Sequence, residues 1–212
     1  MRTISAATLA ATALLLLCLP ARAIPVVDTG TPNSAVLGAY AFDSVDYVAG
    51  EVSFLQSLRI NAVSFHVLGA TAGETFTIAL YTDSASHLPG NILYSGIATL
   101  GMDGWNGLSG LSGWSLAAGR YWLAAEIGPN DTAGNGSLTG TLLDRRVPHP
   151  LALTAFNSGA GYQTAALDFG LRVDATVTPV PEPESWALML IGLGAIPQMM
   201  RRRRRQFSAR HR

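Results

Sequence analysis

Along residues 35–177, apolar and polar residues alternate in short runs, and this period of two limits the fold more than any other feature. In the run 75–82, Phe76, Ile78 and Leu80 fall on one face of an extended chain and Thr77 falls on the other. Gly, Asn, Asp and Ser separate such runs, and no run has the 3.6-residue period of a helix. The sequence therefore predicts an all-β domain.

Four runs alternate most clearly and four more do so weakly. The clear runs are 57–68, 75–82, 120–127 and 167–174, and the weaker ones are 36–42, 92–100, 138–143 and 151–156. In the first, the alternation slips by one residue between Ala62 and Val63, as it does at a β-bulge. Roughly eight short strands with Gly/Pro/Asn turns are typical of an antiparallel β-sandwich, here jelly-roll-like, whose strand order stays open.

The two ends of the chain differ from this body. Residues 1–23 combine a positive start, an apolar core and a small-x-small site at Ala21 and Ala23, so they predict a secretory signal peptide. The single cysteine, Cys18, leaves with it. Residues 24–34 predict a flexible leading segment, residues 35–177 the β-sandwich domain, and residues 178–212 a separate tail.

The tail places three physical devices in series. A Pro/Glu motif at 180–186 precedes an apolar segment at 186–200, and five arginines follow at 201–205. The fifteen residues of the apolar segment would make a helix of about 22 Å, whereas a bilayer core is about 30 Å thick. We expect a short transmembrane helix that anchors weakly, with the arginines retained on the cytoplasmic side.

This tail resembles the PEP-CTERM sorting tails of Gram-negative bacteria. The resemblance implies that an exosortase, a membrane-embedded cysteine protease-like enzyme, recognises the motif and removes the tail. It assigns the sorting motif to Val180, Pro181, Glu182, Pro183 and Trp186. It assigns the membrane stop to Arg201, Arg202, Arg203, Arg204 and Arg205. Pro197 and Gln198 depart from the family pattern by interrupting the apolar segment. The implied route is export through the inner membrane, transient anchoring, and then the cell surface or extracellular matrix.

A second resemblance concerns residues 52–127. The stretches 79–96 and 116–123 are similar to the extracellular β-sandwich domains, sometimes called choice-of-anchor domains, that often precede PEP-CTERM tails. This resemblance implies a fold and says almost nothing about activity.

Charge excludes one class of partner and suggests one class of ligand. Between residues 24 and 180 the chain has five arginines and twelve carboxylates, a net charge of −7, which disfavours nucleic acid. Acidic residues in loops could hold Ca²⁺, and the weak candidates are Asp43, Asp46, Glu51 and Asp83. The alternative is that these carboxylates only keep an exported protein soluble.

The body offers little catalytic chemistry. Its histidines are His66, His87 and His149, and no metal-binding or nucleophile motif surrounds them. The alternation predicts that His66 faces solvent from its strand. We therefore expect no enzymatic activity.

Two tryptophans in a Gly-rich stretch, Trp105 and Trp114, are candidate sugar contacts, because aromatic faces stack on sugar rings. Alternatively, one or both cover the core, which we favour for Trp114. The combined prediction is a structural or adhesive protein of the surface or exopolysaccharide matrix, with a role in biofilms and with exosortase, the inner membrane and exopolysaccharide as partners. The alternative is a secreted or surface enzyme that acts on extracellular polysaccharide.

Overall fold

The computed structural model describes residues 23–32, 39–41, 46–133, 141–143 and 147–177. The predicted signal peptide, except Ala23, and the whole predicted tail lie outside the described residues, as does Asp43. The chain divides into two units, residues 1–178 and 179–212. No segment of the described residues forms a helix long and apolar enough to cross a bilayer.

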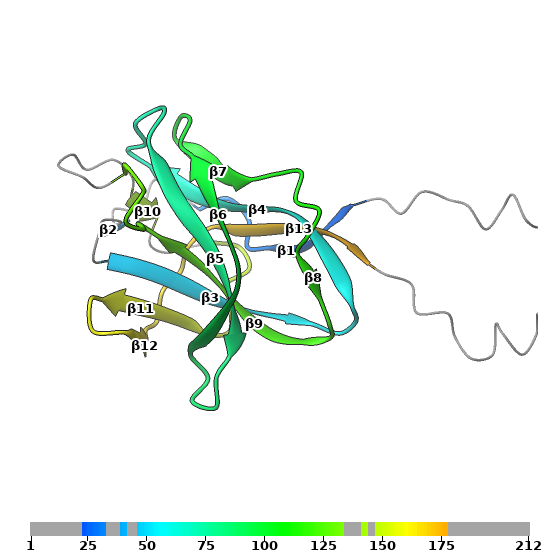
Figure 1. The fold of residues 1–212 in the computed structure, drawn as a ribbon. Helices are drawn as coiled ribbons and strands as arrows, with labels where there is room; N and C mark the ends of the chain where they lie inside the picture. Colours follow the sequence, from blue (N-terminus) through cyan, green and yellow to red (C-terminus); the bar gives the residue numbers. More distant parts are fainter. Residues whose placement is uncertain (1–22, 33–38, 42–45, 134–140, 144–146, 178–212) are drawn as a thin grey trace, which may run out of the picture. The chain divides into compact units, whose positions relative to one another are not determined.

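Two antiparallel sheets make up the described part of the first unit (Figure 1). Sheet A has the order β1 (Ile24–Asp28), β13 (Leu171–Val177), β4 (Leu58–Leu68), β10 (Thr141–Leu143) and β2 (Ala39–Ala41), and β7 (Gly104–Leu108) and β8 (Ser115–Leu116) also pair with β4. Sheet B has the order β12 (Tyr162–Thr164), β11 (Thr154–Ser158), β3 (Asp46–Phe54), β9 (Gly119–Glu126), β5 (Thr75–Asp83) and β6 (Pro89–Thr99). The predicted all-β fold with antiparallel sheets is confirmed.

Alternate residues of each sheet form one hydrophobic core. Strand β4 contributes Val63, Phe65 and Val67, which are fully buried, and Phe65 stacks on Phe169 with the ring centroids 5.9 Å apart. Strand β5 contributes Phe76, Ile78 and Leu80, as its alternation predicted. Since full burial of one such side chain stabilises a fold by about 1.5–3 kcal/mol, these positions fix which face of each strand points inward.

The β-bulge predicted in the first clear run is confirmed. Ala62 lies opposite Asp174 and Ile60 lies opposite Ala175, so Asn61 is the extra residue of β4. The Asn61 side chain accepts a hydrogen bond from Thr176 Oγ1 at 2.9 Å. The bulge lets both Ile60 and Val63 face the core although they are three residues apart.

The N-terminal segment is more ordered than predicted. We expected a flexible leading segment over 24–34, but Ile24–Asp28 forms β1 and pairs with β13. Buried Thr29 completes this attachment, because its N–H donates to Leu171 O and its Oγ1 accepts from Leu171 N, at 3.0 and 2.8 Å.

Three further elements differ from the sequence prediction. Strand β3 was not predicted, and the supposed Gly-rich loop contains strand β7. The run 167–174 becomes a strand only at Leu171, because Thr154 Oγ1 accepts from Leu167 N in place of a neighbouring strand. Leu167 and Phe169 are nevertheless buried.

Candidate functional site

Trp105 lies on the outer face of sheet A and is held there by its own strand. In the register of β7 and β4, Trp105 is opposite His66, while the next residue, Asn106, is opposite Phe65 of the core. Buried Asn106 fixes the turn before the strand, since it accepts from Gly101 N at 2.7 Å and donates to the carbonyls of Met102 and Gly104, each at 3.0 Å. Trp105 is half-buried and its position is set by this turn.

An arginine from β13, on the far side of β4 from β7, covers the Trp105 ring. The guanidinium carbon of Arg172 lies 4.1 Å from the ring centroid, a cation–π contact. Arg172 reaches it across β4 over Ser64, whose partner on β7 is Gly107. A Cβ on Gly107 would lie 2.6 Å from Ser64 Cα, so only glycine allows β7 to lie this close to Ser64 between Arg172 and Trp105.

The same arginine is paired with a carboxylate. Arg172 donates through Nε to Asp28 Oδ2 at 3.2 Å and through Nη2 to Oδ1 at 3.4 Å. Burial alone would raise the pKa of Asp28, but the N–H of Gly30 and the Arg172 charge outweigh it and lower the pKa. We call Asp28, Ser64, His66, Trp105 and Arg172 together the Trp105 surface.

The prediction that His66 faces solvent is wrong. Although it points away from the core, it is only 8% exposed, because the Trp105 ring lies edge-on against it with centroids 5.3 Å apart. A Cβ on Gly170 would lie 2.6 Å from His66 Cβ, so glycine is needed on that side too. Burial lowers the pKa of His66; nearby Asp103 raises it by less and Arg172 lowers it further. The imidazole is therefore neutral at neutral pH, and its buried Nδ1 has no hydrogen-bond partner among the described residues.

Trp114, the other candidate sugar contact, is a core residue. It is 7% exposed, belongs to the main hydrophobic cluster and stacks on Tyr94 with centroids 5.5 Å apart. Of the two alternatives considered for this ring, the structure supports core packing.

The three calcium candidates that the structure describes, Asp46, Glu51 and Asp83, do not form a metal site. Asp46 and Glu51 lie on opposite faces of β3, and five residues of strand separate them by about 16 Å. Asp83 accepts hydrogen bonds from Trp122 Nε1 at 3.0 Å and His87 Nδ1 at 3.1 Å, and Arg120 lies 3.3 Å away. Burial alone would raise the pKa of Asp83, but Trp122, His87 and Arg120 together outweigh burial and lower this pKa. Among the described residues no three metal-binding side chains gather at one point.

The outer face of sheet B carries a second cluster that the sequence did not reveal. A row of fully buried alanines crosses four neighbouring strands, namely Ala155, Ala49, Ala124 and Ala79. Tyr81 reaches over this row, since it lies in register with Trp122 on one side and its hydroxyl donates to Glu126 Oε1 on the other, at 2.6 Å. Tyr162 donates to the same oxygen at 2.5 Å. Each of the four strands contributes a single alanine to this row, and one alanine in a strand gives no sign of such a cluster.

Burial and the Glu126 carboxylate both shape the tyrosines of this cluster. Burial, followed by the hydrogen bond to Glu126, raises the pKa of the Tyr81 hydroxyl far above its ordinary value. Burial, followed by the charge of Glu126, does the same for the pKa of Tyr162. Both phenols therefore stay neutral donors, and the cluster is a second small core that fills its own face of the sheet.

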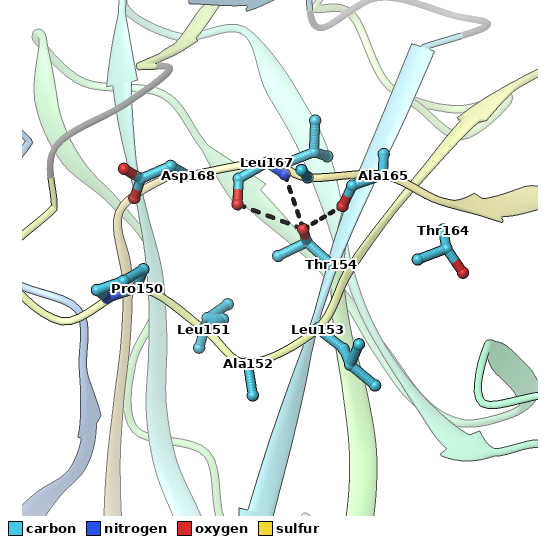
Figure 2. A pocket seen from close by; sticks show the side chains of 10 residues that line it. Pro150, Leu151, Ala152, Leu153, Thr154, Thr164, Ala165, Leu167 and Asp168 are labelled. Atoms are coloured by element: carbon cyan, nitrogen blue, oxygen red, sulfur yellow. Dashed lines mark hydrogen bonds between the residues drawn. The ribbon is translucent and has the colours of Figure 1, made fainter.

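A shallow cavity of about 370 Å³ lies beside β11, between the segments 150–154 and 164–168 (Figure 2). At its centre Thr154 Oγ1 donates to the carbonyl of Ala165 at 2.5 Å and accepts from Leu167 N at 2.9 Å. Asp168 lies at its rim and accepts from Val147 N at 3.3 Å. The lining is mainly apolar and offers no pair of nucleophile and base.

The comparison with known families bears on the tail alone. A family model described as a PEP-CTERM protein-sorting motif matches residues 179–205, and no curated protein matches the chain. The predicted sorting tail is thereby confirmed, although its residues lie outside those described, and the choice-of-anchor resemblance stays a prediction. The chain carries the PEP-CTERM protein-sorting motif, which identifies it as an exported protein that is held transiently in the membrane and processed by an exosortase.

Proposed function

We propose that this exported protein is a structural or adhesive component of the cell surface or exopolysaccharide matrix and contacts polysaccharide through the Trp105 surface. The observation that carries the proposal is the partly exposed Trp105 ring, held between Arg172 and His66. A ring fixed before binding loses little conformational freedom when it stacks on a sugar, so more of the contact energy appears as affinity.

The polar rim of this ring supports the same role. Asp28 and Arg172 keep about a third of their side chains exposed beside Trp105, and Ser64 lies between Arg172 and Gly107 in the register of the sheet. Sugar hydroxyls both donate and accept hydrogen bonds, so they fit a surface with a carboxylate, a guanidinium and a hydroxyl around an aromatic face.

The rival function, an enzyme acting on extracellular polysaccharide, has weaker support. Glycoside hydrolysis uses two carboxyl groups about 5–9.5 Å apart. Glu51 and Glu126 share the outer face of sheet B, but Glu51 is in register with Trp122, four residues before Glu126, so about 13 Å of strand separates the two carboxylates. Glu126 is also occupied by two tyrosine hydroxyls. We therefore propose a non-catalytic role.

Passing the secreted, processed protein over immobilised exopolysaccharide from the producing cells tests this function. We expect retention without any release of sugar, and we expect Trp105→Ala to lower retention about fivefold or more, since stacking on an aromatic ring contributes on the order of 1–3 kcal/mol. Trp105→Phe, which keeps an aromatic face, should lose less. Depolymerised product would favour the enzyme, and retention that is unchanged in Trp105→Ala would remove the Trp105 surface from the proposal.

A further inference from the structure

The charges around Trp105 cancel one another. The cation closest to the ring is Arg172, and two of its nitrogens already donate to both oxygens of Asp28. The buried imidazole of His66 is neutral, and Ser64 carries no charge. The surface therefore presents hydrogen-bonding groups with no net positive charge.

The wider surroundings are acidic rather than basic. Asp174 lies two residues beyond Arg172 on the same face of β13, and exposed Asp103 lies just before β7. Among the residues that the structure describes, the nearest arginine on this face of β4 is Arg59, whose partner on β13 lies four residues from that of Ser64, about 13 Å away and beyond the screening length of physiological salt. The body as a whole has a net charge of −7.

We propose that the Trp105 surface takes an uncharged glycan and discriminates against polymers that carry uronate or sulfate. This inference rests on the proposed polysaccharide contact and names its ligand class. Binding an anionic sugar here would require a cation that Asp28 has already neutralised, and the acidic body would repel the rest of an anionic chain. An uncharged sugar meets neither penalty.

Two matched variants isolate the role of the Asp28–Arg172 pair. Asp28→Asn removes the carboxylate that neutralises Arg172. Asp174→Asn changes the body charge by the same amount, two residues from Arg172 on β13, and leaves the Asp28–Arg172 pair intact. If charge cancellation sets the preference, only Asp28→Asn should improve binding to an acidic glycan. An exposed arginine is worth about 0.5–1 kcal/mol, so the gain should be about two- to fivefold and should fade in high salt.

The experiment uses the secreted, processed protein. Cell-derived exopolysaccharide is separated by anion exchange into neutral and acidic fractions. We expect Trp105-dependent retention on the neutral fraction, and the gain on the acidic fraction for Asp28→Asn alone. Trp105-dependent retention of the wild-type protein on the acidic fraction would overturn the inference and leave the polysaccharide contact standing. An equal gain in Asp174→Asn would show that the body charge sets the preference and would overturn the role given to the Asp28–Arg172 pair. Retention on neither fraction, or retention that ignores Trp105→Ala, would instead overturn the proposed contact itself.

Discussion

Trp105 on sheet A and Trp122 on sheet B both point away from the main core, yet only one of them remains available to a ligand. Trp122 is fully buried and donates through Nε1 to Asp83, whereas Trp105 stays partly exposed under Arg172. The two rings occupy equivalent outward positions in their strands. Their different fates come from their neighbours.

The neighbours differ chiefly in size and reach. On sheet B, the row of alanines leaves room for Tyr81 and Tyr162 to lie down over the strands and close the face. On sheet A, the small residues Ser64 and Gly107 also leave space above the strands. The side chain that lies over them is Arg172, which donates a hydrogen bond to Asp28. Small residues on the outer face of a sheet leave space above the strands. Tyrosine rings that fill this space form a small core, whereas an ion pair that fills it leaves a polar surface.

Removing each ring should show the largest contrast between the faces. Trp122→Ala deletes a fully buried indole and leaves the Asp83 carboxylate without one of its donors, so we expect a loss of about 3–5 kcal/mol in the free energy of unfolding. Trp105→Ala should cost less than half as much, because its ring is already partly in water. Urea unfolding of both variants measures the difference, and equal losses would contradict it.

A smaller effect is expected when the alanine row is overfilled. Ala124 lies between Ala49 and Ala79 beneath the tyrosines, so Ala124→Leu should destabilise the fold by about 1–3 kcal/mol. Ser95→Leu is a matched control, since Ser95 continues the same row on β6 but is exposed, and we expect a change within about 0.5 kcal/mol. Denaturation midpoints compare the two. Similar values would mean that the tyrosines do not close this face.

The sequence predicted the elements whose alternation has one clearly apolar face. Strand β5 and the bulge of β4 were predicted because Phe76, Ile78 and Leu80, and the slip at Ala62, state directly which side is buried. Strand β3 was missed because Ala49, Gly50 and Glu51 separate Val48 from Val52 and are residue types that rarely form strands.

What could not be predicted depends on contacts between distant parts of the chain. The attachment of β1 joins Thr29 to Leu171, 142 residues away, and local composition gives no sign of it. His66 was misplaced because period-two alternation distinguishes faces of a strand but not whether another side chain covers the outer face. The sorting motif was predicted because its residues are consecutive and need no fold to be recognised.

The smallest effect is expected at the ion pair of sheet A, and pH can separate it from packing. Asp28 and Arg172 are each about a third exposed, so solvent screening should limit the loss in Asp28→Asn to about 0.5–1 kcal/mol at pH 7. Because the folded protein lowers the pKa of Asp28, this stabilisation is present above the unfolded value near 3.9 and is lost as the pH falls through the lower folded value. Thermal unfolding of the wild-type protein and Asp28→Asn should therefore converge at about pH 2, while Asp174→Asn serves as the control for body charge. A gap that persists undiminished in acid would show that Asp28 supports β1 by packing or hydrogen bonding, and that its charge is not what holds Arg172 over Trp105.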